Sequence, residues 1–143
     1  MGESRQIMAY DSRTLTSRIL QEIWNAKNPS LIDELYSDDC VIYTPDGEVR
    51  GIEGSKRLYQ TYTSSFPDVR FEIQQIVAES DMASAQLLFT GTHKGPLGKI
   101  PASGNFVKVA NNCFFRFADG KLVEQKDVWD SLSLMRQINA DLS

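Results

Sequence analysis

Apolar residues recur at helical spacing in the first part of the chain. From about residue 12 to residue 27 they fall on one stripe, which predicts an amphipathic helix. The stripe consists of Leu15, Ile19, Leu20, Ile23 and Trp24. Asn28-Pro29 ends this helix, because the residue before a proline disfavours helical backbone angles. Residues 1–11 precede the pattern and are expected to form a loosely ordered lead to a single domain over residues 1–143.

Two further helices and one strand follow. Ser30 can cap a short second helix, whose apolar residues run to Tyr36. Residues 40–44 predict a strand that enters the turn-rich sequence Pro45-Asp46-Gly47. A third helix is predicted over about residues 52–66, with its apolar stripe made of Leu58, Tyr59, Tyr62 and Phe66.

Strands dominate the rest of the chain. Alternating apolar and polar residues predict them over about 69–78, 82–93, 104–117 and 121–129. Asp130 is expected to cap a final helix over about 131–139. Helices followed by a run of antiparallel strands are typical of the α+β class, with the helices on one face of the sheet. A curved sheet around the long first helix makes a cone, whose mouth is a natural small-molecule pocket.

The last predicted hairpin determines which side chains face this pocket. The more apolar set of the first strand is expected to point inward: Val107, Val109, Asn111, Cys113, Phe115 and Phe117. A three-residue loop, Ala118-Asp119-Gly120, pairs Cys113 with Gln125 and Asn111 with Asp127. A two-residue Asp-Gly turn instead directs Asp127 outward, because a one-residue slip inverts every side chain. The three-residue loop is favoured because it places Val123 in the inner apolar row.

In this register Asp127 lies on an otherwise apolar inner face, near Asn111, Cys113 and Gln125. Loss of water raises the pKa of a carboxyl group and makes its anion a better proton acceptor near neutral pH. Two interpretations remain open. Asp127 is either a general base at the floor of a pocket or a structural carboxylate that binds Asn111 and a backbone amide.

Composition narrows the function classes. The 143 residues include 15 basic and 19 acidic ones, a net charge of −4, which argues against a nucleic-acid partner. No apolar window approaches the length of a signal peptide or a membrane span. We therefore expect no membrane partner, and we expect a cytoplasmic location. Two cysteines, Cys40 and Cys113, and one histidine, His93, are too few for a disulfide framework or a His-rich metal site.

Several segments carry a family resemblance. They are residues 91–104 (GTHKGPLGKIPASG), 115–124 (FRFADGKLVE), 127–130 (DVWD) and 136–137 (RQ), together with Arg50-Gly51 before the third helix. With these segments the chain resembles the SnoaL-like polyketide cyclases of the NTF2-like superfamily from about residue 12 to residue 139. The resemblance implies a cone-shaped α+β fold, in agreement with the order of the predicted elements.

The resemblance also implies a chemistry. An aspartate base at Asp127 would remove an acidic proton from a polyketide methyl ester, and the carbanion would close a ring by intramolecular aldol addition, with no metal or organic cofactor. The family's histidine partner falls on Cys113, its first-helix tyrosine on or beside Trp24, and its third-helix asparagine on Leu58. Trp24 and Gln125 are therefore the donors expected near a developing oxyanion.

The candidate substrate contacts extend around this aspartate. They are Trp24, Leu58, Tyr62, His93, Asn111, Cys113 and Gln125. Ring packing against the sheet explains Tyr62 equally well, and His93 lies where a strand enters the loop 94–104, a candidate rim or lid. Cys113 is expected to be a buried structural thiol, and Trp129 an anchor at the sheet edge.

The leading hypothesis is a cofactor-independent cyclase or isomerase of secondary metabolism, in the lyase or isomerase class. Its expected partner is a hydrophobic polyketide-like small molecule, with Asp127 as general acid and base. A non-catalytic binding or scaffolding module and an epoxide or ester hydrolase are the alternatives. The outer sheet face, with Phe106, Phe114 and Leu122 among charged residues, is expected to form a homodimer or a higher homo-oligomer.

Overall fold

The structure is a computed structural model that describes residues 11–139. Its strands are β1 (Tyr36–Thr44), β2 (Gly47–Arg50), β3 (Arg70–Glu79), β4 (Met82–Thr92), β5 (Phe106–Ala118) and β6 (Lys121–Trp129). Its helices are α2 (Ser12–Arg18), η1 (Ile19–Asn25), η2 (Pro29–Leu31), α3 (Ile32–Leu35), α4 (Gly51–Ser65) and α5 (Ser131–Gln137). The expected lead over residues 1–11 lies outside the described residues except for Asp11, whose side chain caps α2 by accepting from the Thr14 backbone N–H at 2.7 Å.

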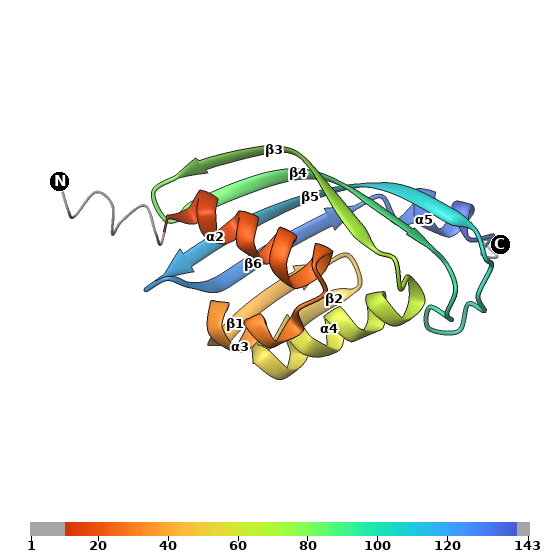
Figure 1. Cartoon of the computed structure of the whole chain (residues 1–143), viewed down its shortest axis with the longest axis horizontal. Helices are drawn as coiled ribbons and strands as arrows, with labels where there is room; N and C mark the ends of the chain where they lie inside the picture. The colour runs from red at the N-terminus through yellow and green to blue at the C-terminus, as the bar shows by residue number, and fades with distance from the viewer. Residues whose placement is uncertain (1–10, 140–143) are drawn as a thin grey trace.

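The strands form one curved six-stranded sheet in the order β2-β1-β6-β5-β4-β3. Figure 1 shows α2, η1, α3 and α4 together on one side of this sheet, with α5 at the far end. This arrangement confirms the predicted α+β class. One pair departs from the expected antiparallel pattern, because β1 and β6 run parallel. No hairpin joins these two strands, so their relative direction is not restricted to antiparallel.

The first predicted helix changes its hydrogen-bond pattern half-way. After α2, the segment η1 is π-helical, with bonds such as Ala26 N–H to Gln21 O at 2.9 Å. Asn25 at its end is clamped to β3, since Asn25 Nδ2 donates to Phe71 O at 2.9 Å and Phe71 N–H donates to Asn25 Oδ1 at 2.8 Å. Such wide turns occur frequently at functional sites, and this one carries Trp24.

Three smaller expectations were inaccurate. Ser30 does not cap a helix: its hydroxyl donates to Asn28 Oδ1 at 2.6 Å inside the 3₁₀ turn η2. The first strand begins at Tyr36 rather than at residue 40, and the edge strand β2 was not predicted. β2 is only four residues long and its alternation is too short to be distinctive. The predicted cap of the final helix is confirmed, because Asp130 Oδ1 accepts from Ser133 N–H at 3.0 Å.

The β5–β6 hairpin corrects the predicted register. Asp119 and Gly120, with φ of 52° and 75°, form a two-residue turn that pairs Ala118 with Lys121. Positive φ at both positions is the signature of the type I′ turn preferred by Asp-Gly. Next to the turn Phe117 pairs with Leu122 and Arg116 with Glu124, so that Val123 is an extra, unpaired residue. The predicted three-residue loop is therefore wrong.

This β-bulge restores the inward direction of the later residues. Beyond it, Phe115 pairs with Gln125, Cys113 with Asp127, and Asn111 with Trp129. Asp127 thus faces inward as expected, but it lies opposite Cys113 and not opposite Asn111. Leu122 is fully buried, so its expected place on the outer face was also wrong.

The core lies between the helices and the concave face of the sheet. The largest fully buried side chains include Ile19, Ile23 and Ile32 from the helices, and Ile42, Leu87, Phe115 and Leu122 from the sheet. Complete burial of such a side chain stabilises the fold by about 1.5–3 kcal/mol. This core holds α2 and η1 against the sheet and leaves the other end of the cone for a cavity.

The loop between β4 and β5 is bound to the end of α4. Lys94 and Gly95 N–H both donate to Ser65 O, at 3.0 and 3.1 Å, and Ser65 Oγ donates to Pro96 O at 2.8 Å. A Cβ atom at Gly95 would overlap the carbonyl oxygen of Ser64. The glycine therefore permits a close backbone approach that fixes the loop beside the cone's open end.

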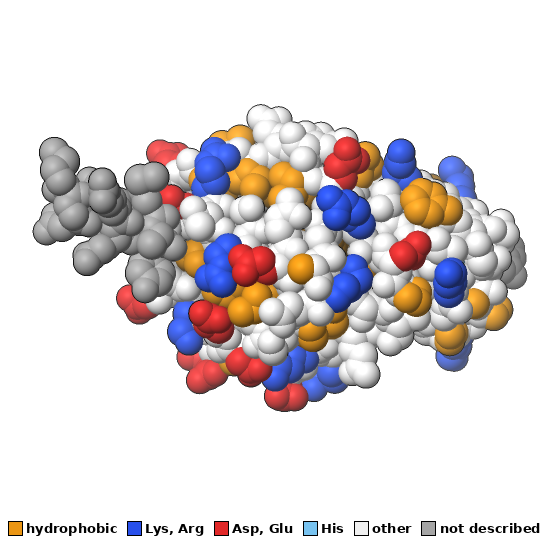
Figure 2. Space-filling model, viewed as in Figure 1, with side chains coloured by type: hydrophobic (Ala, Val, Ile, Leu, Met, Phe, Trp, Pro, Cys, Tyr) orange, Lys and Arg blue, Asp and Glu red, His pale blue; other side chains and the backbone are white. Residues whose placement is uncertain are grey.

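Charges of both signs are interspersed on the surface. On the face in Figure 2, basic and acidic side chains alternate and form no continuous patch of one sign. In the described part of the chain, no helix has the length and apolar character needed to cross a membrane.

Candidate functional site

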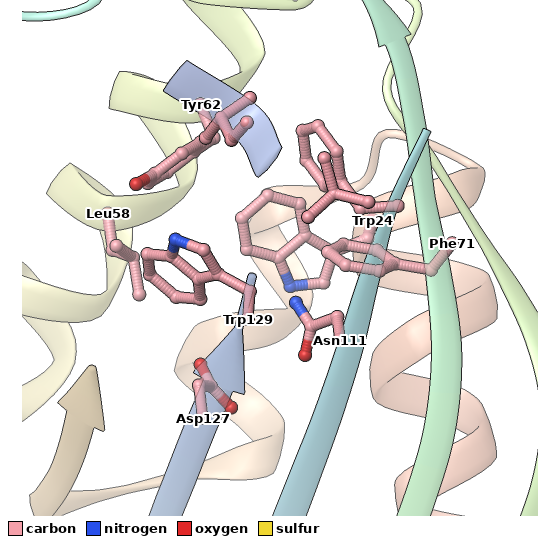
Figure 3. A pocket seen from close by; sticks show the side chains of 10 residues that line it. Trp24, Leu58, Tyr62, Phe71, Asn111, Asp127 and Trp129 are labelled. Atoms are coloured by element: carbon pink, nitrogen blue, oxygen red, sulfur yellow. The ribbon is translucent and has the colours of Figure 1, made fainter. Parts of the chain in front are cut away.

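A cavity lies at the open end of the cone, between the sheet and the helices. Its lining is mostly aromatic and aliphatic, with two polar exceptions, Asn111 and Asp127 (Figure 3). The full lining is Trp24, Leu58, Tyr62, Phe71, Phe89, Val109, Asn111, Asp127, Trp129 and Leu134. Apolar walls with a few placed polar groups are typical of small-molecule sites.

Two neighbouring pockets share part of their lining, and we name them the inner chamber and the outer chamber. The inner chamber, which contains Asp127, has a volume of about 50 Å³, whereas the outer chamber has about 410 Å³. Leu58, Tyr62, Trp129 and Leu134 line both chambers and so form a partition between them. The outer walls come from the β1–β2 turn, the loop near Leu97 and Ile100, and α5.

Aromatic rings fix the shape of the inner chamber. Trp24 lies edge-on to Phe71, with ring centroids 5.3 Å apart, and Tyr62 lies edge-on to Trp129 at 5.7 Å. Phe71 and Phe89 are 5.5 Å apart. Edge-to-face pairs at these distances are favourable and restrict each other's rotation. The walls of the chamber are therefore ordered by packing between η1, α4 and the sheet.

Asp127 lies at the floor of the inner chamber. The Gln125 amide donates to both of its carboxylate oxygens, with Nε2 to Oδ1 and Oδ2 distances of 2.9 and 3.0 Å. Burial raises the pKa of Asp127 from 3.8 to about 6, although the hydrogen bonds from Gln125 lower it in part. The carboxyl group is therefore a proton acceptor matched to near-neutral pH.

Asn111 and Cys113 lie beside this carboxylate on β5. Cys113 Sγ donates to Asn111 Oδ1 at 3.1 Å. Both residues are buried, with Cys113 5% exposed and Asn111 6% exposed. Burial raises the pKa of the Cys113 thiol well above its usual range, with a further contribution from the charge of Asp127. The thiol is thus a neutral hydrogen-bond donor and not a nucleophilic thiolate.

Two tyrosines are also affected by the buried carboxylate. Burial raises the pKa of Tyr36, and the charge of Asp127 raises it further. Burial also raises the pKa of Tyr62, and the charge of Asp46 raises it further. The Tyr62 hydroxyl lies 3.4 Å from Asp46 Oδ2. Both hydroxyl groups therefore stay protonated, as donors and not as bases.

His93 lies outside the cavity lining. Its ring packs against Phe66 with centroids 5.3 Å apart and is fully buried at the base of the β4–β5 loop. Ser103 N–H donates to His93 Nδ1 at 3.1 Å, so the neutral ring carries its proton on Nε2. Burial lowers the pKa of this histidine. The ring closes the loop onto the sheet, and the expected substrate contact is not part of the cavity.

The structure places the other sequence-derived candidates in two layers. Trp24, Leu58, Tyr62, Asn111 and Asp127 line the cavity, whereas Cys113 and Gln125 lie behind it and contact the polar pair. Trp129 lines both chambers, although an anchor at the sheet edge was expected. Its spacing of two residues from Asp127 in one strand is a signal that could have indicated the shared face.

Several lining residues were missed. Phe71, Phe89 and Leu134 come from segments distant in sequence, and only the packing of β3, β4 and α5 brings them together.

Within residues 11–139, no group of three or more His, Cys, Asp and Glu side chains is arranged to hold a metal ion.

Comparison with known proteins decides the family. A family model described as SnoaL-like polyketide cyclase matches residues 14–138. The chain belongs to the SnoaL-like polyketide cyclase family. A search of curated proteins finds no match.

Solved structures of SnoaL-like proteins share the fold. A protein from Jannaschia sp. CCS1, provisionally described as a SnoaL-like polyketide cyclase, is 25% identical with a TM-score of 0.84, over 91% of this chain and 92% of that one. TsrD from Streptomyces laurentii is 30% identical with a TM-score of 0.79, over 90% and 95% of the two chains. AclR from Streptomyces galilaeus, provisionally described as a hydroxylase, is 29% identical with a TM-score of 0.79, over 90% and 95%. The predicted NTF2-like cone is thereby confirmed.

Proposed function

We propose that this SnoaL-like protein is a cofactor-independent cyclase that uses Asp127 as general base and then as general acid. The observation that carries the proposal is the Asp127 carboxylate, held inside an apolar chamber with its pKa raised to about 6. A base with this pKa is largely ionised at neutral pH and still binds a proton well. The family assignment supports the same reaction class.

The proposed reaction conserves all atoms of the substrate. The Asp127 carboxylate removes a proton from a carbon next to a carbonyl group, which leaves an enolate. The nucleophilic carbon attacks a second carbonyl carbon of the same molecule, and a carbon–carbon bond closes the ring. The resulting alkoxide takes the proton back from Asp127, so the product is a cyclic alcohol isomeric with the substrate.

The chamber walls restrict the substrate class. Three charged residues line the two chambers, and all of them are acidic: Asp46, Glu48 and Asp127. A substrate carboxylate would be repelled there, and burial next to Asp127 would remove its hydration. A neutral ester with an aromatic body fits both the charge and the aromatic walls.

The size of the chambers restricts its position. An inner chamber of about 50 Å³ holds only the reacting end of a polycyclic molecule, and the outer chamber of about 410 Å³ holds the body. The reacting carbon then passes the partition formed by Leu58, Tyr62, Trp129 and Leu134. This arrangement surrounds the carbanion with apolar side chains, which limits its protonation by water.

The test uses synthetic esters whose aldol closure is defined. The probes are the methyl ester of phenylacetic acid with a 2-oxopropyl group in the ortho position, its naphthalene and anthracene analogues, and the free acids. Ring closure and deuterium incorporation from D₂O are followed by chromatography and NMR. We expect turnover of at least one ester, weaker turnover of its acid, and a loss of about 10²–10⁴-fold in Asp127→Asn.

Asp119→Asn is the matched control, because it makes the same change at the exposed turn, where φ of 52° suits asparagine. Retained turnover in Asp127→Asn would dismiss the base assignment. Ester binding that is equal in the native protein and Asp127→Asn, with no exchange or closure in either, would instead establish a non-catalytic binding module.

A further inference from the structure

The side-chain amide of Asn111 presents unused hydrogen-bond donors to the inner chamber. Asn111 is 6% exposed and lines that chamber. Its Oδ1 accepts from Cys113 Sγ at 3.1 Å, whereas its Nδ2 has no hydrogen-bond partner among residues 11–139. Nδ2 is not fully enclosed by protein atoms, so it borders the open space of the chamber, where a ligand oxygen can accept from it.

Cys113 determines which end of this amide faces the chamber. Its thiol remains protonated, because burial raises its pKa, and it has one hydrogen to donate. The carboxylate of Asp127 already receives both of its short hydrogen bonds from Gln125. The thiol hydrogen is therefore available to Asn111 Oδ1, which directs Nδ2 away from Cys113 and into the chamber.

A second donor faces the same space. In Figure 3 the indole of Trp24 and the amide of Asn111 both lie above Asp127. The Trp24 indole N–H also has no hydrogen-bond partner in the described segment 11–139, and Trp24 lines the chamber. Two N–H groups that line one chamber without a protein acceptor form a site for an oxygen atom with negative or partial negative charge.

We propose that Asn111 Nδ2 and Trp24 Nε1 bind the substrate carbonyl oxygen that becomes the enolate oxygen, and that Cys113 is the positioning residue for Asn111. The proposal rests on the proposed proton abstraction by Asp127. When Asp127 takes the proton it becomes neutral, and the negative charge moves to the substrate oxygen. The two N–H donors stabilise the charge at that position, so the chamber never holds two negative charges.

The strand register provides the necessary separation. Cys113 lies directly opposite Asp127, so Asn111 is the diagonal neighbour of Asp127 on the same face. Diagonal neighbours in an antiparallel pair are about 7–8 Å apart. That distance accommodates one substrate carbon at hydrogen-bond reach of the base and the adjoining carbonyl oxygen at reach of Nδ2.

Binding of a stable oxyanion tests the donor site without turnover. The protein is prepared as Asp127→Asn, which mimics the protonated base, and titrated with 4-nitrophenolate. Its methyl ether, 4-nitroanisole, has the same ring but no oxyanion. In this background we expect Asn111→Leu to weaken 4-nitrophenolate binding about 10–100-fold, the range for hydrogen bonds to charged groups, and to leave 4-nitroanisole binding within about twofold.

Variants of the positioning residue give the second contrast. Cys113→Ala removes the donor and is expected to weaken 4-nitrophenolate binding about three- to tenfold, whereas Cys113→Ser keeps a donor and restores most of the affinity. Because a buried variant can fail to fold, the side-chain ¹⁵N–¹H signal of Asn111 is also recorded in Asp127→Asn alone. It is expected to move downfield with 4-nitrophenolate and not with 4-nitroanisole.

Three results would overturn the donor site. They are equal losses for phenolate and ether in Asn111→Leu, no phenolate binding to Asp127→Asn at millimolar concentration, and an Asn111 amide signal that responds equally to both probes. These results are independent of the base assignment. Turnover that survives in Asp127→Asn would remove the proposed function and leave the phenolate contrast unchanged.

Discussion

Some neighbours of Asp127 stabilise its ionised form, and others destabilise it. The surrounding apolar side chains remove water and raise its pKa, while the hydrogen bonds that Gln125 donates lower it. The balance leaves a pKa of about 6, between the value in water and that of a carboxyl group with no donors. Residues that donate to Asp127 therefore set the pH range in which its carboxyl group is ionised.

The pH dependence of turnover follows directly. We expect kcat/KM of an active ester to rise about tenfold per pH unit below pH 6 and to level off above it, since only ionised Asp127 accepts the proton. Gln125→Leu removes the bonds that lower the pKa and is expected to shift the midpoint upward. Lys126→Gln, on the outer face beside it, is the control. A midpoint that is unchanged in Gln125→Leu would contradict this account.

The same pKa shift predicts a stability effect. The folded protein binds the Asp127 proton more tightly than the unfolded chain, whose pKa is 3.8, so stability falls as pH rises from about 4 to about 6. Asp127→Asn removes this cost and is expected to stabilise the protein by up to about 3 kcal/mol at pH 8.

Urea unfolding at pH 8 and at pH 4 measures this effect. Most of the gain is expected to disappear at pH 4, where Asp127 is protonated in the folded protein and about half protonated in the unfolded chain. Asp119→Asn is expected to change the free energy of unfolding by less than about 0.5 kcal/mol, since substitutions at exposed sites have small effects. Equal stability of Asp127→Asn and the native protein at pH 8 would show that the buried charge carries no cost.

At the scale of elements, the bulge at Val123 decides which way the Asp127 side of β6 faces. The type I′ turn alone would direct Asp127 outward, and the extra residue Val123 reverses this. The two-residue turn and the bulge would each direct Asp127 outward without the other, and together they direct it inward. Bulges commonly redirect side chains next to active sites.

Two single-residue deletions separate the bulge from the strand that follows it. Deleting Val123 removes the unpaired residue and leaves the pairs Cys113–Asp127 and Phe115–Gln125 intact. We expect a folded protein that loses roughly 1–3 kcal/mol of stability and keeps 4-nitroanisole binding.

Deleting Lys126 instead reverses the direction of Asp127 and Trp129. That variant is expected to lose ligand binding and to show a red-shifted tryptophan fluorescence, because Trp129 becomes exposed. Equal ligand binding by the two deletion variants would contradict this account of the register.

This hairpin also shows how far the sequence predicts the fold. Alternation in β5 was sufficient to identify its inward residues, and Asp-Gly identified the turn, but neither reveals an extra residue beyond it. Bulges depend on the pairing of two strands, so a single strand pattern carries little information about them. For the same reason Asp127 could be identified as a site residue, whereas its partner across the sheet could not.

The cavity shows a similar limit. Trp24, Leu58 and Tyr62 were predictable from helical stripes, because these stripes must face the sheet. Phe71, Phe89 and Leu134 join them only through tertiary packing. The free donor of Asn111 was not predictable, since it depends on a hydrogen bond from Cys113 to the other end of the amide.

At the scale of the whole molecule, the outer face of the sheet has none of α2, η1, α3 and α4 over it (Figure 1). Phe106, Val128 and Val77 point outward there and are 61%, 68% and 58% exposed. Phe106 was expected on this face, whereas Val77 and Val128 add to it. Exposed apolar side chains on a sheet face that no helix covers are typical of protein interfaces.

We therefore expect the protein to form a homodimer through this face at micromolar concentration. Sedimentation velocity is expected to give about twice the monomer mass of 16.1 kDa. Val128→Lys places a charge in the interface and is expected to weaken dimerisation at least tenfold. Leu132→Lys, at a 50% exposed position on α5, is the control. A single 16.1 kDa species for the native protein would contradict the expectation.

The parallel pairing of β6 with β1 places Asp127 on an interior strand, bonded along both sides of its backbone. Much of the outer chamber's wall instead comes from the β1–β2 turn, the loop near Leu97 and the short helix α5, beside α4 and Trp129. Loops and turns tolerate sequence change far better than interior strands do. A protein organised in this way can exchange the molecules it accepts over evolutionary time while the proton acceptor stays in place, so reaction and specificity can diverge separately.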